Sequence, residues 1–511
     1  MPAMSTPLPS AAPPKAPRMP RLLANAGWNL AGQIVPLLVG LAVLPLLIRT
    51  LGLDRYGFLT LVWVLVGYAS IFDFGIGRVL IRVVALRLAQ GDTRGAHHVA
   101  RVGLSFLGVF GLVMATAFAA CSALLVDHVF TVPAGLRDEA VHAMWLLAAS
   151  LPFVMLTSGY SGVLSAHQQF RGANLVRALM GSLSYLGPLL VAMWINRLDA
   201  LVAFALAMRL AATLVHDLLA RRTCAFRFVP VMPDAATTRE LVSLGGWVAI
   251  SNLVAPMLSY LDRLLLGALV PVRIVAFYAT PFDLIGRAQV LPNALMAALF
   301  PTAAAVRPGS DAAKDLMLRT ARLLYVLAVP VCFAFVSLAR PGLRAWLGEE
   351  FAAQAAPVLQ VLAIGILFNT LAQAPAMLIQ AAGQPRVMAL LHVVELPLFV
   401  AVLYGLTVHM GIVGTALAAA LRNGLDAIAV LLLARRDVAR GAVSWGAAVV
   451  PVSVAALLLG AALWPSTAAA SVTVFVVGLT AFLVYAWTVV LWSDERAHLR
   501  AICFPARSPR P

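Results

Sequence analysis

The chain has 511 residues, of which 62% are hydrophobic and 11% are charged; 35 arginines and two lysines face 21 acidic residues, for a net charge of +16. Soluble domains are about 45–50% apolar and about 25% charged, so this composition excludes a soluble fold. A basic chain can bind nucleic acid, but these arginines separate long apolar runs, as do the charges that orient membrane helices. The four cysteines lie far apart and form neither a zinc pattern nor a disulfide framework.

The first 24 residues are predicted to form a disordered cytosolic tail, because they are rich in proline and small side chains. The apolar stretch that follows, 28–48, exceeds the about 7–15 residues of a signal-peptide core. We therefore expect it to stay in the protein as the first membrane span.

Fourteen stretches have the about 20 mostly apolar residues that a membrane helix needs, which predicts an all-α integral membrane protein. The spans are predicted at 26–49, 57–77, 102–126, 141–165, 174–195, 199–220, 244–268, 276–300, 319–339, 357–381, 386–408, 411–434, 444–464 and 471–492.

A weak internal similarity divides these spans into two halves. Trp28 to Tyr56 and Trp247 to Tyr278 both run from a tryptophan at the start of a span to a tyrosine that opens the next one. The predicted organisation is a tail 1–24, an N-lobe 25–222, a cytosolic linker 223–243, a C-lobe 244–436, two further spans in 437–493 and a cytosolic tail 494–511.

The distribution of cations predicts the orientation. Segments on the N-terminal side of the alternating spans carry 26 lysines and arginines, whereas the opposite side carries seven. Because cytosolic loops are enriched in cations, both termini are expected in the cytosol, with the protein in the bacterial inner membrane.

Motifs of catalysis are missing from the sequence. It contains no Walker A pattern, no HExxH and no DxD, and its longest loop has about two dozen residues. We therefore expect a transporter, without a metal or an organic cofactor, rather than an enzyme.

Four short segments give the chain a family resemblance. LGLDRYG at 51–57, FDFGI at 72–76, DRLLLG at 262–267 and FY at 277–278 resemble the Wzx-type flippases that export O-antigen or exopolysaccharide. Their superfamily also holds the multidrug-extrusion (MATE) carriers and the lipid II flippase MurJ. The resemblance implies two six-helix lobes around a central cavity, with two appended helices. It also implies alternating access that moves an undecaprenyl-pyrophosphate-linked glycan to the periplasmic leaflet, alongside polymerase machinery.

Such a cargo needs cations inside the membrane domain. A pyrophosphate is dianionic, and arginine binds phosphate through two parallel hydrogen bonds. A charged residue at the centre of a membrane helix costs about 2.5–3.5 kcal/mol, so a buried arginine should face a cavity or a partner. The candidate substrate-binding cations are Arg209, Arg287, Arg422 and Arg263 within spans, and Arg78 and Arg82 at the end of the second span.

Two of these arginines have a structural alternative. Arg287 follows Asp283 by four residues, and Arg422 precedes Asp426 by four. At this spacing, each pair can form an ion pair on one helical face. Each arginine is thus expected either to bind the anion or to neutralise its own carboxylate.

The other two spanning arginines differ. Arg209 has no acidic residue three or four positions away, although His216 lies two turns along, so it must face water or a distant partner. Arg263, beside Asp262 near a predicted periplasmic end, can bind an anion or extend to the membrane interface.

Further charges lie at a span end and within spans. Arg78 and Arg82 share one face, where they serve topology or form a cytosolic vestibule for pyrophosphate. Asp73 and Glu395 are intramembrane acids that can couple transport to a proton or sodium gradient, or bond to a neighbouring helix.

Several functions stay open at this point. A MATE-like drug or cation antiporter is expected to have twelve spans and an acidic chamber, whereas a lipid II flippase shares the fourteen spans and the basic cavity. A membrane-embedded glycan polymerase or ligase usually has a long periplasmic loop, and no such loop is present. A purely structural subunit would need every buried arginine to be paired.

Overall fold

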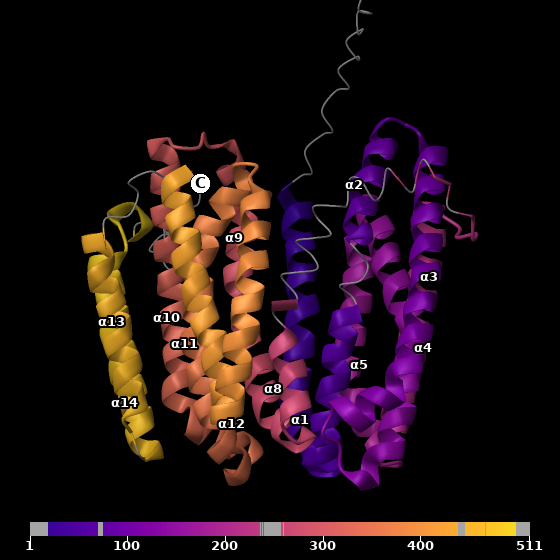
Figure 1. The fold of residues 1–511 in the computed structure, drawn as a ribbon. Helices are drawn as coiled ribbons and strands as arrows, with labels where there is room; N and C mark the ends of the chain where they lie inside the picture. Colours follow the sequence, from indigo (N-terminus) through magenta and orange to yellow (C-terminus); the bar gives the residue numbers. More distant parts are fainter. Residues whose placement is uncertain are drawn as a thin grey trace, which may run out of the picture. The chain divides into compact units, whose positions relative to one another are not determined.

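The structure, a computed structural model, describes residues 19–69, 75–232, 234, 235, 237, 239, 257, 258, 260–437, 445–465 and 467–496. Within these residues every regular element is a helix (Figure 1). Ten helices in the described part of the chain are long and apolar enough to cross a membrane. The prediction of an all-α, multi-pass membrane protein is confirmed.

The chain forms two compact units, Met1–Pro256 (the N-unit) and Met257–Pro511 (the C-unit). The N-unit contains α1 (Met19–Ala69), α2 (Ile76–Ala89), α3 (Thr93–Leu124), η2 (Leu125–Val129), η3 (Ala134–Leu136), α4 (Arg137–Ala166), α5 (Phe170–Ala192) and α6 (Leu198–Cys224). The C-unit contains α8 (Val272–Gly286), η4 (Arg287–Gln289), α9 (Val290–Ala305), α10 (Asp311–Leu347), α11 (Glu349–Ala381), α12 (Pro385–Asp437), α13 (Trp445–Leu463), α14 (Ala468–Tyr485) and η5 (Ala486–Val490), preceded by helical residues 260–269.

Helix α1 reverses direction at Gly52, whose φ of 75° is a conformation that favours glycine. Gly40 precedes this point and Trp63 follows it, yet both pack against Tyr185 of α5. A Cβ at Gly40 would lie 3.2 Å from the Tyr185 ring, and the Trp63 and Tyr185 ring centroids are 5.6 Å apart. The two arms of α1 therefore correspond to the first two predicted spans.

Helix α12 reverses in the same way at Gly411, where φ is 58° and ψ is −138°. The hydroxyls of Thr407 and Thr415 meet at 2.9 Å across the turn. Far from the turn, Nε2 of His392 and Oδ1 of Asp426 are still only 3.9 Å apart. The eleventh and twelfth predicted spans are thus the two arms of one hairpin.

Two predicted spans differ from the observed helices. The second was expected to end at residue 77, but the chain forms a separate helix, α2, that begins at Ile76 after the left-handed Gly75. The eighth was expected to be continuous, but the 3-10 segment η4 interrupts it between α8 and α9. The seventh predicted span, 244–268, is described only in part, from residue 257.

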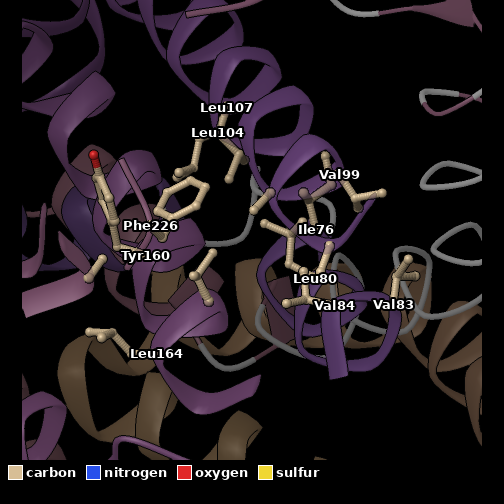
Figure 2. Packing of buried hydrophobic residues seen from close by; sticks show 14 of the residues in the cluster. Ile76, Leu80, Val83, Val84, Val99, Leu104, Leu107, Tyr160, Leu164 and Phe226 are labelled. Atoms are coloured by element: carbon tan, nitrogen blue, oxygen red, sulfur yellow. The ribbon is translucent and has the colours of Figure 1, made fainter. Parts of the chain in front are cut away.

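The core of the N-unit forms where α2 packs against α3 and α4. Leu80, Val84 and Leu104 are fully buried there, together with Val163, and Phe226 closes the cluster from beyond α6 (Figure 2). This buried apolar face stabilises α2, which is only 14 residues long, by packing against its neighbours.

Three turns of the N-unit meet at one end of the bundle around Glu139. Arg55, after the α1 turn, donates to the Glu139 carboxylate at 2.9 Å. The backbone N–H of Leu198, at the start of α6, donates to the other carboxylate oxygen at 3.0 Å. Asn196 also donates to the carbonyl of Thr50 at 2.9 Å. The turns that join spans 1–2, 3–4 and 5–6 thus lie together, as alternating spans require.

The last two helices, α13 and α14, pack on α10 within the C-unit (Figure 1). Tyr325 of α10 donates to the carbonyl of Pro451 at 2.8 Å. Beyond η5, Trp492 lies 3.4 Å from the guanidinium carbon of Arg322, and Asp494 accepts from Arg319 at 2.8 Å. The appended pair is therefore anchored both by aromatic packing and by charge.

Candidate functional site

A cavity in the N-unit, which we call the N-unit pocket, is lined mainly by apolar side chains and by a smaller set of polar ones. It measures ≈ 470 Å³ and lies among α1, α4, α5 and α6. Its polar lining consists of five hydroxyl groups and three basic side chains: Ser150, Thr157, Ser158, Ser161, Ser184, Arg177, Arg209 and His216. No aspartate or glutamate is among the described residues that line it. The pocket is therefore suited to an anion rather than to a cation.

Arg209 contributes an unneutralised charge to this pocket. It stands in the middle of α6, and among the described residues no acidic group forms an ion pair with it and no acceptor receives its guanidinium. Only its backbone carbonyl is engaged, by the hydroxyl of Thr213 at 2.9 Å. An arginine held in a membrane helix without a counter-charge has five donors available for a ligand.

Arg177 and His216 widen the basic lining. One terminal nitrogen of Arg177, on α5, donates to the side-chain oxygen of Asn174 at 2.9 Å, and this bond orients the guanidinium without neutralising it. His216 is 5% exposed, and its Nδ1 lies 2.8 Å from the carbonyl of Ala212. The sequence analysis counted Arg177 only among the cytosolic-side cations, at the start of the fifth predicted span, whereas the folded chain brings it to the pocket.

The nearest acid along α6 is occupied elsewhere. Asp217 accepts a hydrogen bond from Tyr160 at 2.9 Å and forms an ion pair with Arg221 at 2.6 Å. It follows His216 directly but does not line the pocket. Asp217 thus leaves the positive charge of Arg209 uncompensated.

Arg263, by contrast, is enclosed in a network of the C-unit. Its terminal nitrogen lies 3.3 Å from Asp283, and its Nε lies 3.7 Å from Asp262. The guanidinium also packs on Phe282, with 4.1 Å to the ring centroid. Tyr278 donates to the second oxygen of Asp262 at 2.5 Å. Arg263 is 5% exposed, so the expectation that it extends to the membrane interface is wrong.

Arg287 lies where α8 gives way to η4, so the regular helical spacing that would align it with Asp283 ends at this residue. Asp283 makes its ion pair with Arg263, while Arg287 acts on the same carboxylate electrostatically. Next to Arg287, Gln289 joins η4 to α11 through Asn369 at 3.0 Å and Gln373 at 3.0 Å. Sequence reasoning missed this polar joint, because isolated amides carry no spacing signal.

The α12 hairpin brings four ionisable residues together. His392 and Glu395 lie on its first arm, and Arg422 and Asp426 lie on its second. Side-chain atoms of His392, Glu395 and Asp426 are all within 4.8 Å of one another. Among the described residues Arg422 forms no ion pair with Asp426; it donates instead to Asn423 at 2.8 Å. The neutralisation that their four-residue spacing predicted does not form.

Arg78 and Arg82 lie on the exposed face of α2, opposite its buried apolar side. No ion pair joins either residue to another part of the chain that the structure describes. Both roles proposed for them thus stay predictions. Asp73 lies outside the described residues.

Comparisons with known proteins give the chain a family. A sequence profile described as polysaccharide biosynthesis protein matches residues 22–306, and the chain belongs to this family. A Shigella flexneri protein provisionally named an O-antigen transporter is 29% identical over 80% of this chain and 96% of its own length. EpsK, an uncharacterised membrane protein of Bacillus subtilis (strain 168), is 23% identical over 78% of this chain and 79% of its own.

Solved structures with the same fold are transporters and flippases. The lipid II flippase MurJ in an inward closed conformation matches with a TM-score of 0.69 and 10% identity, over 91% of this chain and 99% of that one. An inward-facing MATE multidrug transporter matches with a TM-score of 0.65 and 14% identity, over 80% of this chain and 97% of that one. The chain therefore has the fold of the superfamily that its short segments resemble, and these names agree with the expectation of a non-enzymatic protein.

Proposed function

We propose that this protein is a flippase that moves a polyprenyl-pyrophosphate-linked oligosaccharide from the cytosolic to the periplasmic leaflet by alternating access, for cell-surface polysaccharide synthesis. The observation that carries the proposal is the N-unit pocket, a cavity among membrane helices whose described lining includes basic side chains and no acidic one. Family membership and the relative provisionally named an O-antigen transporter support it independently.

The chemistry of the pocket fits such a cargo. A pyrophosphate offers several anionic oxygens, and Arg209 and Arg177 supply forked donors that match them. The pocket hydroxyls, such as Ser158 and Ser161, can exchange hydrogen bonds with phosphate or sugar oxygens. An anionic group beside Arg209 would offset the cost of holding its charge in the membrane, so the pocket should favour capture of such a group.

The same lining disfavours the export of cationic drugs. A cationic ligand binds most strongly beside carboxylates, and none is among the described residues that line the pocket, although the aromatic rings of Trp63 and Phe204 are. In the proposed orientation both termini are cytosolic, which follows from the 26 cations on that side against seven on the other. The cargo would thus enter from the side on which it is synthesised.

The test is translocation of a fluorescent undecaprenyl-pyrophosphate-linked glycan in proteoliposomes. Arg209→Gln removes the charge and most donors, so we expect flipping to fall about 10- to 100-fold, the effect of losing a charge-assisted hydrogen bond of about 1.5–3 kcal/mol. Arg209→Lys keeps the charge but not the fork and should lie between. Arg287→Ala and Arg422→Ala examine the other predicted cations in the same assay.

The matched control is Arg227→Gln, the same change at an exposed residue after α6. It should flip at the rate of the intact protein. If folded Arg209→Gln also flips at that rate, Arg209 does not bind the cargo. If the intact protein moves no glycan with or without an ion gradient, the flippase proposal fails.

A further inference from the structure

Two helical arms of the C-unit present acidic side chains to each other inside the membrane domain. His392 and Glu395 are three residues apart, so both lie on one face of the first arm. The reversal at Gly411 brings Asp426 of the second arm opposite them, with His392 Nε2 3.9 Å from Asp426 Oδ1. Atoms of the three side chains lie within 4.8 Å of one another.

Three of the four carboxylate oxygens in this group have no donor among the described residues. Both Oε atoms of Glu395 and Oδ1 of Asp426 are buried, and none of them receives a hydrogen bond from any described residue. Asp426 is 8% exposed, so its side chain is almost wholly removed from solvent. An ionised carboxylate can only accept hydrogen bonds, and two that face each other therefore satisfy neither. One proton held between them would be a donor for both.

The nearby guanidinium does not supply that donor. Arg422 gives a hydrogen bond to Asn423 and lies over the ring of Phe399, 5.4 Å from its centroid, while its Nε has no acceptor among the described residues. It contributes one positive charge against the two carboxylates. With a neutral His392, the group is therefore left with one unit of negative charge.

The elements packed against the hairpin do not remove this charge. Helix α11 carries charges only at its N-terminal end, Glu349 and Glu350, where Arg340, Arg344 and Arg273 bind them. From α8 and the helical residues before it come Tyr278, Asp283, Asp262 and Arg263, which bind one another. Tyr278 is the member of that network on which Arg422 acts electrostatically. The remaining unit of charge must come from a mobile cation.

We propose that Glu395 and Asp426 form a binding site for a single exchangeable proton, with His392 beside it as the group that relays the proton. Two carboxylates at this separation hold one proton more readily than none, because like charges repel strongly in a low-dielectric interior. A sodium ion would prefer a shell of oxygen atoms alone. Here an imidazole occupies one side.

The proton site itself does not depend on the proposed function, but its coupling role rests on that function. In this role, the proton is the ion whose gradient drives the flippase. Its uptake and release change the charge of the α12 hairpin by one unit. A neutral hairpin tolerates a dry environment, whereas the ionised one favours contact with water. Proton binding therefore biases the equilibrium between two states of the C-unit.

The test is infrared difference spectroscopy of the full chain in proteoliposomes, without any glycan, between about pH 5 and pH 9. We expect the C=O band of a protonated carboxyl group to be present at the acidic end and to disappear within this range. Glu395→Gln and Asp426→Asn should each abolish the titrating band. The control Glu350→Gln makes the same change at an exposed residue of α11 and should leave the band intact.

The intact protein alone can overturn the proposal, because the absence of a titrating carboxyl band does not depend on the folding of any variant. A band that disappears when sodium replaces choline at constant pH would also overturn it, in favour of a sodium site. The readout is independent of transport. If the band titrates but the protein moves no glycan, the proton site is supported and the flippase proposal is contradicted. If the protein moves glycan but shows no titrating band, the flippase proposal is supported and the proton site is contradicted.

Discussion

Tyr278 and Asp262 form a buried hydrogen bond of 2.5 Å that holds the charged network of the C-unit together. The Tyr278→Phe change removes this donor and leaves one oxygen of a buried carboxylate without it, although the backbone N–H of Arg263 still donates to the other at 2.7 Å. We expect a loss of about 1–3 kcal/mol in the free energy of unfolding. Denaturant unfolding of the purified protein in detergent measures it.

The control for that change is Tyr404→Phe, because Tyr404 is 54% exposed on α12. It should leave the unfolding free energy within about 0.5 kcal/mol of the intact protein. Equal stability of the two variants would mean that Asp262 finds another donor once Tyr278 is lost.

Asp234 lies beyond α6, outside the membrane spans, and should give a local pH dependence. The backbone N–H and hydroxyl of Thr237, and then His98, lower the pKa of Asp234 from 3.8 to about 2; the Thr237 N–H donates at 2.7 Å. A lowered pKa stabilises the folded form above the unfolded pKa, and this contribution is lost as the pH falls through the folded value. We expect protection of the Thr237 amide to be constant above about pH 4 and to decrease towards pH 2.

Hydrogen exchange corrected for the intrinsic rate measures this protection. Asp234→Asn keeps an acceptor for the Thr237 amide but cannot titrate, so its protection should not change over the same range. A decrease of the same size in Asp234→Asn would place the acid sensitivity elsewhere.

At the level of single residues, the sequence identifies candidate charged residues better than it predicts the contacts that their side chains make. Arg209 is identified because it interrupts an apolar span without an acidic neighbour, and it lines the N-unit pocket. The ion pair of Arg422 with Asp426 was wrongly expected as one alternative, because spacing along one helix does not reveal the contacts of the guanidinium with Asn423 and Phe399. His392 gives no signal at all, since its partners depend on how the two arms of a hairpin align.

Close contact between α2 and α4 depends on a glycine. A Cβ at Gly162 would collide with the carbonyl oxygen of Gly77, and a backbone atom cannot move aside as a flexible side chain can. We expect Gly162→Ala to separate the two helices and to cost about 1–3 kcal/mol, as overpacking of a core does. The midpoint of thermal unfolding in detergent is the measurement.

Gly342 of α10 provides the matched control, since a Cβ there would meet nothing within 4 Å. Both substitutions gain the same helix propensity, up to about 1 kcal/mol, so the difference between them isolates the steric contact. If both variants unfold at the same temperature, the approach of α2 to α4 is looser in solution.

Among the elements, hydropathy predicts the apolar helices well and their interruptions poorly. The arms of α1 and α12 were found as four separate spans because each arm is long enough to cross the membrane alone. The break at η4 was not predicted, because Arg287 and Gln289 interrupt a span that is still apolar enough on average to cross a membrane. Polar contacts with α11 satisfy that break, and they exist only in the folded unit.

At the scale of the whole molecule, alternation of the spans can be tested against the positions of the turns. The minority of seven cations includes Arg55, Arg137 and Arg197, which belong to the three turns of the N-unit that meet around Glu139. The turns that carry few cations thus lie together at one end of the N-unit. The positive-inside rule requires this of a periplasmic end. The rule then assigns the opposite end, with Arg227, to the cytosol.

Cysteine labelling in intact cells tests this orientation. In a background with Cys121→Ser and Cys503→Ser, where Cys224 and Cys332 are buried, a cysteine introduced at Asn196 should react with an impermeant maleimide from outside. A cysteine at Arg227 should react only after the cells are permeabilised, because segments with the excess of cations are retained in the cytosol. Labelling of both sites in intact cells would indicate a mixed topology. The reverse pattern would put the cation-rich side outside, and the N-unit pocket could not then receive a cargo made in the cytosol in the proposed direction.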